Sequence, residues 1–454
     1  MADTLFFTRA LLPEGWADNV LLTCEHGVIH SVRHDAPPPP AGISGAVALP
    51  GLASLHSHTF QRAMAGLAET RGPSSDSFWS WRQVMYRFLG LLDPEDVEAI
   101  AAFAFMEMLE AGFTAVGEFH YLHHDRTGNP YADRAELAGR IVAAAGTSGI
   151  GLTLLPVFYA HGGFGAVPAH EGQRRFLNDL DGFQRLVEGA RTALLALPGA
   201  RLGIAPHSLR AVAPDELQAL LAAWPEGPVH IHIAEQVKEV EDCIAWSGRR
   251  PVEWLFDHVA VDDRWCLVHA THLNEAETRH LAESGAVAGL CPITEANLGD
   301  GTFRLAEYMA RGGRFGVGTD SNVEISAPGE LRQLEYSQRL AHRARNVSAM
   351  AEGDSTGGTL YRAALAGGAQ ALAQPVAGLQ VGQRADIVCL AADHPDLVAA
   401  TADRHVDGYV FCAGRAAIDQ VYVGGARLVE GGRHRGHAAI ANRYKDTIRK
   451  LSGR

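Results

Sequence analysis

The chain has 454 residues, of which 47% are hydrophobic and 20% charged, and its formal net charge is −13. This length suits one large domain together with a smaller one, and the composition is that of a soluble globular protein with ample apolar material for a core. The acidic balance, without a block rich in lysine or arginine, argues against nucleic acid as a partner.

The sequence also predicts where the protein works. The N-terminus lacks a basic start followed by a long apolar region, so no secretory signal is expected. Apolar stretches such as residues 141–145 are far too short to span a bilayer. The six cysteines are scattered, with no Cys-x-x-Cys pair, which fits a reducing compartment. We therefore expect a cytoplasmic protein with no membrane partner.

Short strands are predicted near both ends of the chain. They are expected over residues 4–10, 20–24, 28–32, 386–391, 418–423 and 426–429. Each of these β-rich ends is too short to bury a good core alone. We predict that residues 1–48 and 377–454 pair into one small β-sandwich domain.

Between these ends, short apolar runs alternate with longer helical stretches. Strands are expected over residues 114–117, 151–156, 201–205, 229–234, 265–269, 286–290 and 314–318. A helix is predicted over residues 93–111, because Asp93 suits its N-cap, Pro94 its first position and Gly112 the residue just past its end. This alternation predicts an α/β fold, a (β/α)₈ barrel over residues 49–376.

The first barrel strand is expected to end in two histidines. Alternation along a strand puts His56 and His58 on one face, where two imidazoles make half of a zinc site. In a chain with 22 histidines, about one His-x-His is expected by chance. A second copy of the pattern, His230-Ile-His232, shows that the pattern is not specific by itself. The pattern alone leaves metal binding undecided.

Further candidate ligands stand where other predicted strands end. In a barrel of this kind the chemistry takes place at the C-terminal ends of the strands. The residues found there are His56, His58, His232, Glu235, His269 and Asp320. Such an arrangement is far harder to obtain by chance than one His-x-His pair.

At these residues the chain resembles the amidohydrolase superfamily, and the resemblance covers almost its whole length. It looks like the single-metal deaminase branch, because no lysine at a strand end is available as a carboxylated bridging ligand. Within that branch it most resembles the formimidoylglutamate deiminases of histidine degradation. The closer match is carried by residues 205–210 (APHSLR), 291–301 (CPITEANLGDG) and 320–338.

The resemblance implies one Zn²⁺ per chain, held by His56, His58, His232 and Asp320, with a position kept for water. Zinc would lower the pKa of that water toward neutrality, so that hydroxide attacks the substrate, although Fe²⁺ and Mn²⁺ can share such ligands. The implied catalytic residues are Glu235 as proton shuttle, His269 as a hydrogen-bond partner of the water or tetrahedral centre, and Asp320 as an acceptor of the water's proton.

Other histidines compete for these roles. On an alternating strand His230 shares a face with His232, so spacing cannot separate them; the His-x-x-Glu relation and the family pattern favour His232. His272 is expected to be structural or to lie behind the ligands. We expect no functional metal at the loop histidines His120, His123 and His124.

A formimidoyl-glutamate substrate carries two carboxylates and a cationic formimidoyl group, so its pocket needs cationic donors at one end and carboxylates at the other. Arg82 and Arg210, on loops after two different strands, can each bind a carboxylate through two hydrogen bonds. Gln61, Tyr121 and His207 are expected to add single hydrogen bonds.

The leading hypothesis is zinc-dependent hydrolysis of N-formimidoyl-L-glutamate to N-formyl-L-glutamate and ammonia. One alternative is a deaminase of an aromatic amine, such as an adenosine derivative or guanine. Purine and pterin deaminases usually carry Cys-Pro-x-Ser-Asn where this chain has Cys291-Pro-Ile-Thr-Glu295, and they tend to lack an arginine at the position of Arg210. Another alternative is a metal-free structural relative, but six matched polar groups argue against a scaffold. The resemblance also implies a homodimer.

Overall fold

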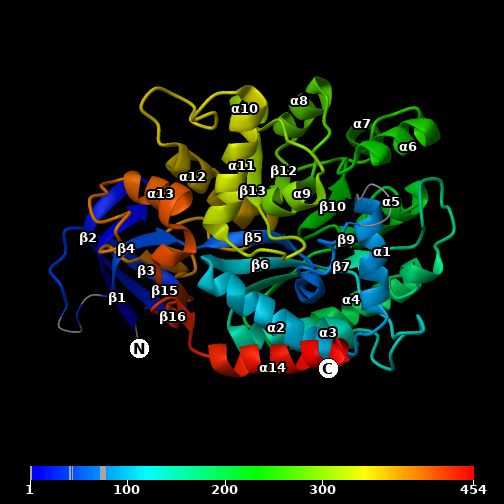
Figure 1. The fold of residues 1–454 in the computed structure, drawn as a ribbon, viewed down its shortest axis with the longest axis horizontal. Helices are drawn as coiled ribbons and strands as arrows, with labels where there is room; N and C mark the ends of the chain where they lie inside the picture. The colour runs from blue at the N-terminus through cyan, green and yellow to red at the C-terminus, as the bar shows by residue number, and fades with distance from the viewer. Residues whose placement is uncertain (1–2, 40–41, 43, 72–77, 454) are drawn as a thin grey trace.

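The computed structural model describes residues 3–39, 42, 44–71 and 78–453, and its centre is a parallel β-barrel (Figure 1). The barrel strands are β5 (Leu52–Ser57), β6 (Phe113–His120), β7 (Gly151–Phe158), β8 (Arg201–Leu202), β9 (Ala205–Pro206), β10 (Val229–Ile233), β11 (Trp265–His269), β12 (Val287–Leu290) and β13 (Arg314–Val317). Strands β8 and β9 both pair with β7 and together fill one position of the barrel.

Two parallel sheets, β5 to β9 and β10 to β13, close on each other through single bridges. Ile204 pairs with Val229 on one side, and Ser57 pairs with Asp320 on the other. Small and branched side chains, including Ala53, Leu55 and Val268, fill the interior. The predicted (β/α)₈ barrel is confirmed.

Helices follow the barrel strands and pack around them (Figure 1). They are α1 (Phe78–Leu89), α2 (Pro94–Glu110), α3 (Glu136–Ser148), α4 (Leu180–Leu194), α5 (Pro214–Ala223), α6 (Val237–Ser247), α7 (Pro251–His258), α8 (Glu275–Ser284), α9 (Pro292–Leu298), α10 (Leu305–Ala310), α11 (Ala327–His342) and α12 (Thr356–Ala371). Helix α2 has Asp93 as its N-cap and Pro94 in its first turn, as predicted. Among the described helices, none combines the length and apolar composition needed to cross a membrane.

The strands of the two chain ends pair with each other, as expected. They are β1 (Asp3–Leu12), β2 (Gly15–Glu25), β3 (Val28–Arg33), β4 (Gly45–Pro50), β14 (Ile387–Leu390), β15 (Ile418–Val423), β16 (Ala426–Glu430) and β17 (Arg433–His434). They form one continuous mixed sheet in the order β17-β16-β15-β14-β4-β1-β2-β3, which has a hydrophobic core of its own. The antiparallel β4–β14 pair joins the two ends.

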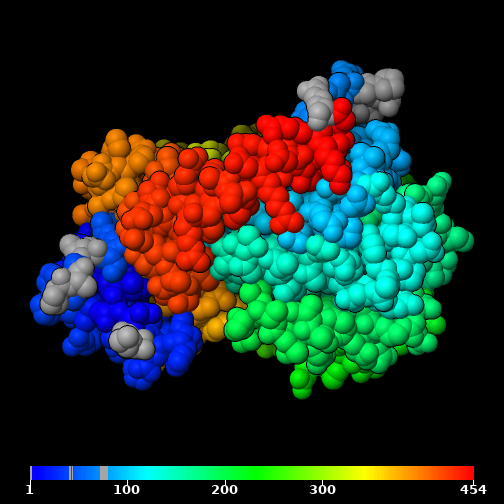
Figure 2. All heavy atoms as spheres, turned by 90° about the horizontal axis from the view of Figure 1, so that it is seen from below, coloured from blue at the N-terminus to red at the C-terminus, as the bar shows by residue number. Residues whose placement is uncertain are grey.

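Two helices near the C-terminus were not predicted, α13 (Arg404–Gly408) and α14 (His437–Leu451). Helix α14 lies along the barrel and packs on α2, where the ring of Tyr444 stacks on that of Phe103 with centroids 4.0 Å apart. Figure 2 shows this C-terminal segment in red across the lower face of the molecule. Ile440, Tyr444, Ile448 and Leu451 are nevertheless spaced as on one face of a helix, and they pack on the hydrophobic core.

A buried ion pair links the terminal sheet to the barrel. Arg384 donates two hydrogen bonds to Asp386, at 2.8 and 2.7 Å, and a third of 3.0 Å to Gln374. Gln374 in turn donates to the backbone oxygen of Leu152 on β7 at 3.0 Å. The side chain of Asp386 is only 2% exposed.

We predict that Arg384→Met destabilises the fold, because it leaves the carboxylate of Asp386 buried without its cation. The free energy of unfolding should fall by about 3–5 kcal/mol, measured as a lower thermal midpoint. As a control, Arg449→Ala removes a salt bridge to Asp446 whose side chains are 65% and 74% exposed, and should cost less than about 1 kcal/mol. Equal effects of the two substitutions would contradict this assignment.

Candidate metal centre

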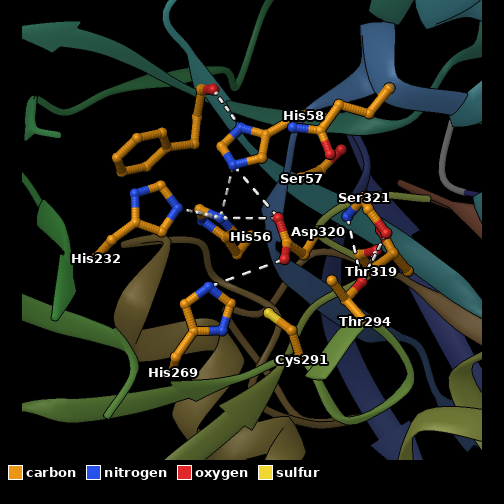
Figure 3. Close-up of polar contacts among 12 residues, drawn as sticks. His56, Ser57, His58, His232, His269, Cys291, Thr294, Thr319, Asp320 and Ser321 are labelled. Atoms are coloured by element: carbon orange, nitrogen blue, oxygen red, sulfur yellow. Dashed lines mark hydrogen bonds and ion pairs between the residues drawn. The ribbon is translucent and has the colours of Figure 1, made fainter. Parts of the chain in front are cut away.

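Four buried side chains meet at the C-terminal end of the barrel (Figure 3). His56 lies on β5 and His58 just after it, His232 lies on β10, and Asp320 follows β13. Nε2 of His56 is 3.2 Å from Nε2 of His58 and 3.1 Å from Nε2 of His232. Oδ1 of Asp320 is 3.3 Å from Nε2 of His58 and 3.5 Å from Nε2 of His56. These are the four ligands that the sequence predicts.

The orientation of the rings suits a bound cation. Nδ1 of His58 donates to the backbone oxygen of Phe119 at 2.9 Å, and Nδ1 of His232 donates to that of His207 at 3.0 Å. With the proton on Nδ1, each neutral ring directs the lone pair of its Nε2 into the cluster. Donor atoms that share one zinc ion through bonds of about 2.0–2.2 Å lie no more than about 4.4 Å apart, and a catalytic site also keeps a position for water. The observed spacings and the three-nitrogen, one-oxygen donor set fit such an ion.

Burial also sets the ionisation that metal binding requires. It lowers the pKa of His56 to about 3 and those of His58 and His232 below their usual range, so the rings are neutral. Burial alone would raise the pKa of Asp320, but its hydrogen bond to His56 and the nearby imidazoles lower that pKa overall. Neutral imidazoles and an ionised carboxylate are the forms that bind a divalent metal.

The backbone holds these ligands in place. His58 donates its N–H to the oxygen of Asp320 at 2.9 Å, and Asp320 donates to the oxygen of His56 at 3.0 Å. The side-chain amide of Asn322 donates to the oxygens of both His58 and Asp320, at 3.2 and 3.0 Å. A Cβ at Gly318 would lie 2.8 Å from the backbone of His56, so only glycine permits this approach of the last strand to the first.

Two further predicted residues stand beside the ligands. Nε2 of His269 lies 3.8 Å from Oε1 of Glu235 and 3.8 Å from Oδ2 of Asp320. Burial alone would lower the pKa of His269, but the carboxylates of Glu235, Asp320 and Glu295 raise it to about 10. Burial raises the pKa of Glu235 above its usual value, although His269 and Arg210 oppose the shift.

Glu295 is an unpredicted partner of His269. Its Oε1 lies 3.2 Å from Nδ1 of His269 and accepts a hydrogen bond from the backbone N–H of Cys291 at 2.8 Å. His269, Cys291 and Glu295 are close enough to hold a metal. However, burial raises the pKa of the Cys291 thiol well above its usual value, so the thiol stays protonated and does not favour a cation.

A cavity opens beside the ligands. Its wall includes every residue that the sequence predicts for substrate binding, namely Gln61, Arg82, Tyr121, His207 and Arg210. Glu235, His269 and Asp320 line the same cavity. It also contains aromatic residues that sequence reasoning did not select, Trp81, Tyr86, Tyr159 and Phe176.

The competing histidines face elsewhere. Nε2 of His230 donates to the backbone oxygen of Ala371 at 2.7 Å inside the barrel. Nε2 of His123 and of His124 likewise donate to backbone oxygens, those of Val157 and Leu177. Nε2 of His272 donates to the oxygen of Asp300 at 2.9 Å. Each of these rings therefore has a structural hydrogen bond outside the four-residue cluster.

Comparisons with known proteins agree with this geometry. The model of the amidohydrolase family matches residues 47–428, and that of the N-terminal domain of the formimidoylglutamate deiminase HutF matches residues 3–43. The chain is 52% identical to the formimidoylglutamate deiminase of Pseudomonas aeruginosa over 99% of both chains.

Solved structures give the same result. An amidohydrolase from Brucella melitensis superposes with a TM-score of 0.96 at 56% identity, covering 99% of each chain. The atrazine chlorohydrolase of Arthrobacter aurescens complexed with zinc, at 22% identity, has a TM-score of 0.82 over 98% of this chain and 100% of that one, and shares the fold. The chain therefore belongs to the amidohydrolase family of metal-dependent hydrolases, in its formimidoylglutamate deiminase group.

Proposed function

We propose that this enzyme uses one zinc ion to hydrolyse N-formimidoyl-L-glutamate, in histidine degradation. Water adds to the formimidoyl carbon and the terminal C–N bond breaks, giving N-formyl-L-glutamate and ammonia. The observation that carries this proposal is a cavity lined by three of the four clustered donors, His58, His232 and Asp320, together with Glu235 and the two arginines Arg82 and Arg210. The 52% identity to a formimidoylglutamate deiminase along the whole chain supports the same substrate.

We propose His56, His58, His232 and Asp320 as the zinc ligands. Zinc held there supplies Lewis acidity, which lowers the pKa of the attacking water toward neutrality. Asp320 also lies within reach of His269 and can accept the proton that the water loses. His58, His232 and Asp320 all line the cavity, so substrate and water have access to the cluster.

Glu235 is suited to carry a proton to the departing nitrogen. It lines the cavity and is 4% exposed, and burial raises its pKa, which favours the protonated form. His269, with Glu295 behind it, is placed to hydrogen-bond the water or the tetrahedral centre. A divalent cation beside His269 would oppose the rise in its pKa that the carboxylates cause.

The cavity walls are charged in the way that the substrate requires. The cationic formimidoyl group of the substrate would face Glu235 and Asp320. The two carboxylates of the substrate would face Arg82 and Arg210. Gln61 donates to the hydroxyl of Tyr121 at 2.9 Å, so these two residues are held together beside His58. We propose that Gln61, Tyr121 and His207 add hydrogen bonds to the substrate.

We further propose that the enzyme is a cytoplasmic homodimer. The free state of all six cysteines, five of them buried, is compatible with a reducing compartment.

Substitutions separate the roles of the two histidines of β10. His232→Ala should lose both metal and activity, because it removes a ligand. His230→Gln keeps a donor for the oxygen of Ala371 and should retain most of both. Metal content per chain, measured by elemental analysis alongside turnover, checks this. If His230→Gln lost the metal while His232→Ala kept it, His230 and not His232 would be the ligand.

A substitution at Glu235 tests its role as the proton carrier. Glu235→Gln keeps the shape of the side chain but cannot carry a proton, so turnover should fall by roughly 10²-fold or more while the metal stays bound. Steady-state ammonia release and metal analysis on the same sample test this. Full turnover in the variant would assign proton transfer to another group.

A substitution at Arg210 tests the identity of the substrate. Arg210→Met should lower kcat/KM for N-formimidoyl-L-glutamate by roughly 30-fold or more, since losing a buried partner of a charged group costs about 2–5 kcal/mol. Zinc content should not change. Arg185→Met, an exposed arginine on α4, is the matched control. A wild-type enzyme that ignored this compound but deaminated adenosine or guanine would overturn the proposed function.

A further inference from the structure

The hydroxyl of Tyr159 has an unusual set of neighbours. Tyr159 directly follows β7, is 2% exposed and lines the cavity. Its oxygen lies 2.9 Å from a guanidinium nitrogen of Arg82 and 2.5 Å from the amide nitrogen of Gln173. Two side chains from different segments thus converge on a single hydroxyl oxygen.

Both neighbours must be donors. A guanidinium carries N–H groups only and cannot accept a hydrogen bond. The orientation of the Gln173 amide is fixed by its other end, because its Oε1 accepts the backbone N–H of His170 at 2.9 Å. Its NH₂ group therefore faces Tyr159. The Tyr159 oxygen accepts two hydrogen bonds, and its own proton needs a third partner.

That partner belongs in the cavity. Among the described residues, the Tyr159 hydroxyl accepts both of the hydrogen bonds that it makes, and it donates none. An anionic acceptor is favoured at this place, because Arg82 contributes a positive charge at the same oxygen. A substrate carboxylate would receive the proton of Tyr159 together with a charge-assisted hydrogen bond from Arg82.

The position of Tyr159 indicates which carboxylate this is. The ring centroid of His207 lies 4.9 Å from that of the proposed ligand His232 and 4.5 Å from that of Tyr159. Tyr159 thus packs against a ring that itself packs against a proposed metal ligand. By contrast, Arg210 lies within 3.8 Å of Glu235, close to the reacting centre. In N-formimidoyl-L-glutamate the side-chain carboxylate is further from the formimidoyl carbon than the α-carboxylate is. The carboxylate beside Tyr159 is therefore the side-chain one.

We propose that Tyr159 binds the substrate directly, by donating its hydroxyl proton to the side-chain carboxylate of N-formimidoyl-L-glutamate. Arg82 binds the same carboxylate, and Gln173 fixes the direction of the hydroxyl. This inference rests on the proposed function. The competing explanation is that Tyr159 only positions Arg82 and never contacts the substrate.

The first test compares two substrates. In Tyr159→Phe, kcat/KM for N-formimidoyl-L-glutamate should fall roughly 10- to 100-fold, as expected for a lost hydrogen bond to a charged group. For N-formimidoyl-L-2-aminobutyrate, which lacks the side-chain carboxylate, it should change less than about threefold. Thermal melting and metal content establish that the variant is folded and loaded. Tyr308→Phe removes a buried hydroxyl remote from the cavity, which donates to the oxygen of Arg314 at 3.0 Å, and should leave both values unchanged.

The second test separates direct contact from positioning. Tyr159→Phe is repeated in an Arg82→Met background with N-formimidoyl-L-glutamate. If Tyr159 donates directly to the substrate, its loss in this background still lowers kcat/KM roughly fivefold or more. If Tyr159 only positions Arg82, its loss has no further effect on kcat/KM. Loss of the effect in this background, or equal effects on both substrates, overturns the inference. A wild-type enzyme inactive on N-formimidoyl-L-glutamate would instead overturn the proposed function.

Discussion

The barrel is closed by hydrogen bonds that the proposed metal ligands themselves make. The backbones of His56 and His58 bond to that of Asp320 where the first strand meets the last, and His232 donates to the oxygen of His207 at 3.0 Å across the other junction. The two places where the parallel sheets join are thus the two places that supply ligands. The donor spacing is therefore fixed by closure of the fold itself, and not by mobile loops.

Much of this site could be predicted from the sequence, because the barrel imposes a simple rule. Parallel strands end at one rim, so polar residues that follow apolar runs must converge there. His56, His232 and Asp320 are far apart in the chain, yet each follows or ends such a run. The pairing of the two chain ends could also be predicted, since neither end could bury a core alone, although strand β4, which makes that pairing, was not predicted.

The residues behind the ligands could not be predicted in this way. Asn322 and Glu295 act through hydrogen bonds to backbone or ring atoms, which no spacing in the sequence specifies. Glu118 is similar, since its buried carboxylate accepts the backbone N–H of Thr59 at 2.8 Å, just after His58. The role proposed for Tyr159 depends on the orientation of the Gln173 amide, which no spacing in the sequence specifies. Helix α14 was also not predicted, although its apolar residues have helical spacing.

The rim also carries backbone strain. His269 and Asp320 have φ values of 68° and 40°, and Asn322 has one of 55°, in the left-handed region that residues other than glycine rarely adopt. Each such residue costs on the order of 1–3 kcal/mol and persists only where its surroundings force it. Here the cross-strand hydrogen bonds supply that force. A metal ion that bridges β5, β10 and the end of β13 would tie both junctions together, so that its binding energy offsets this strain. The same hydrogen bonds thus close the barrel, hold the strained backbone and set the positions of the donor atoms.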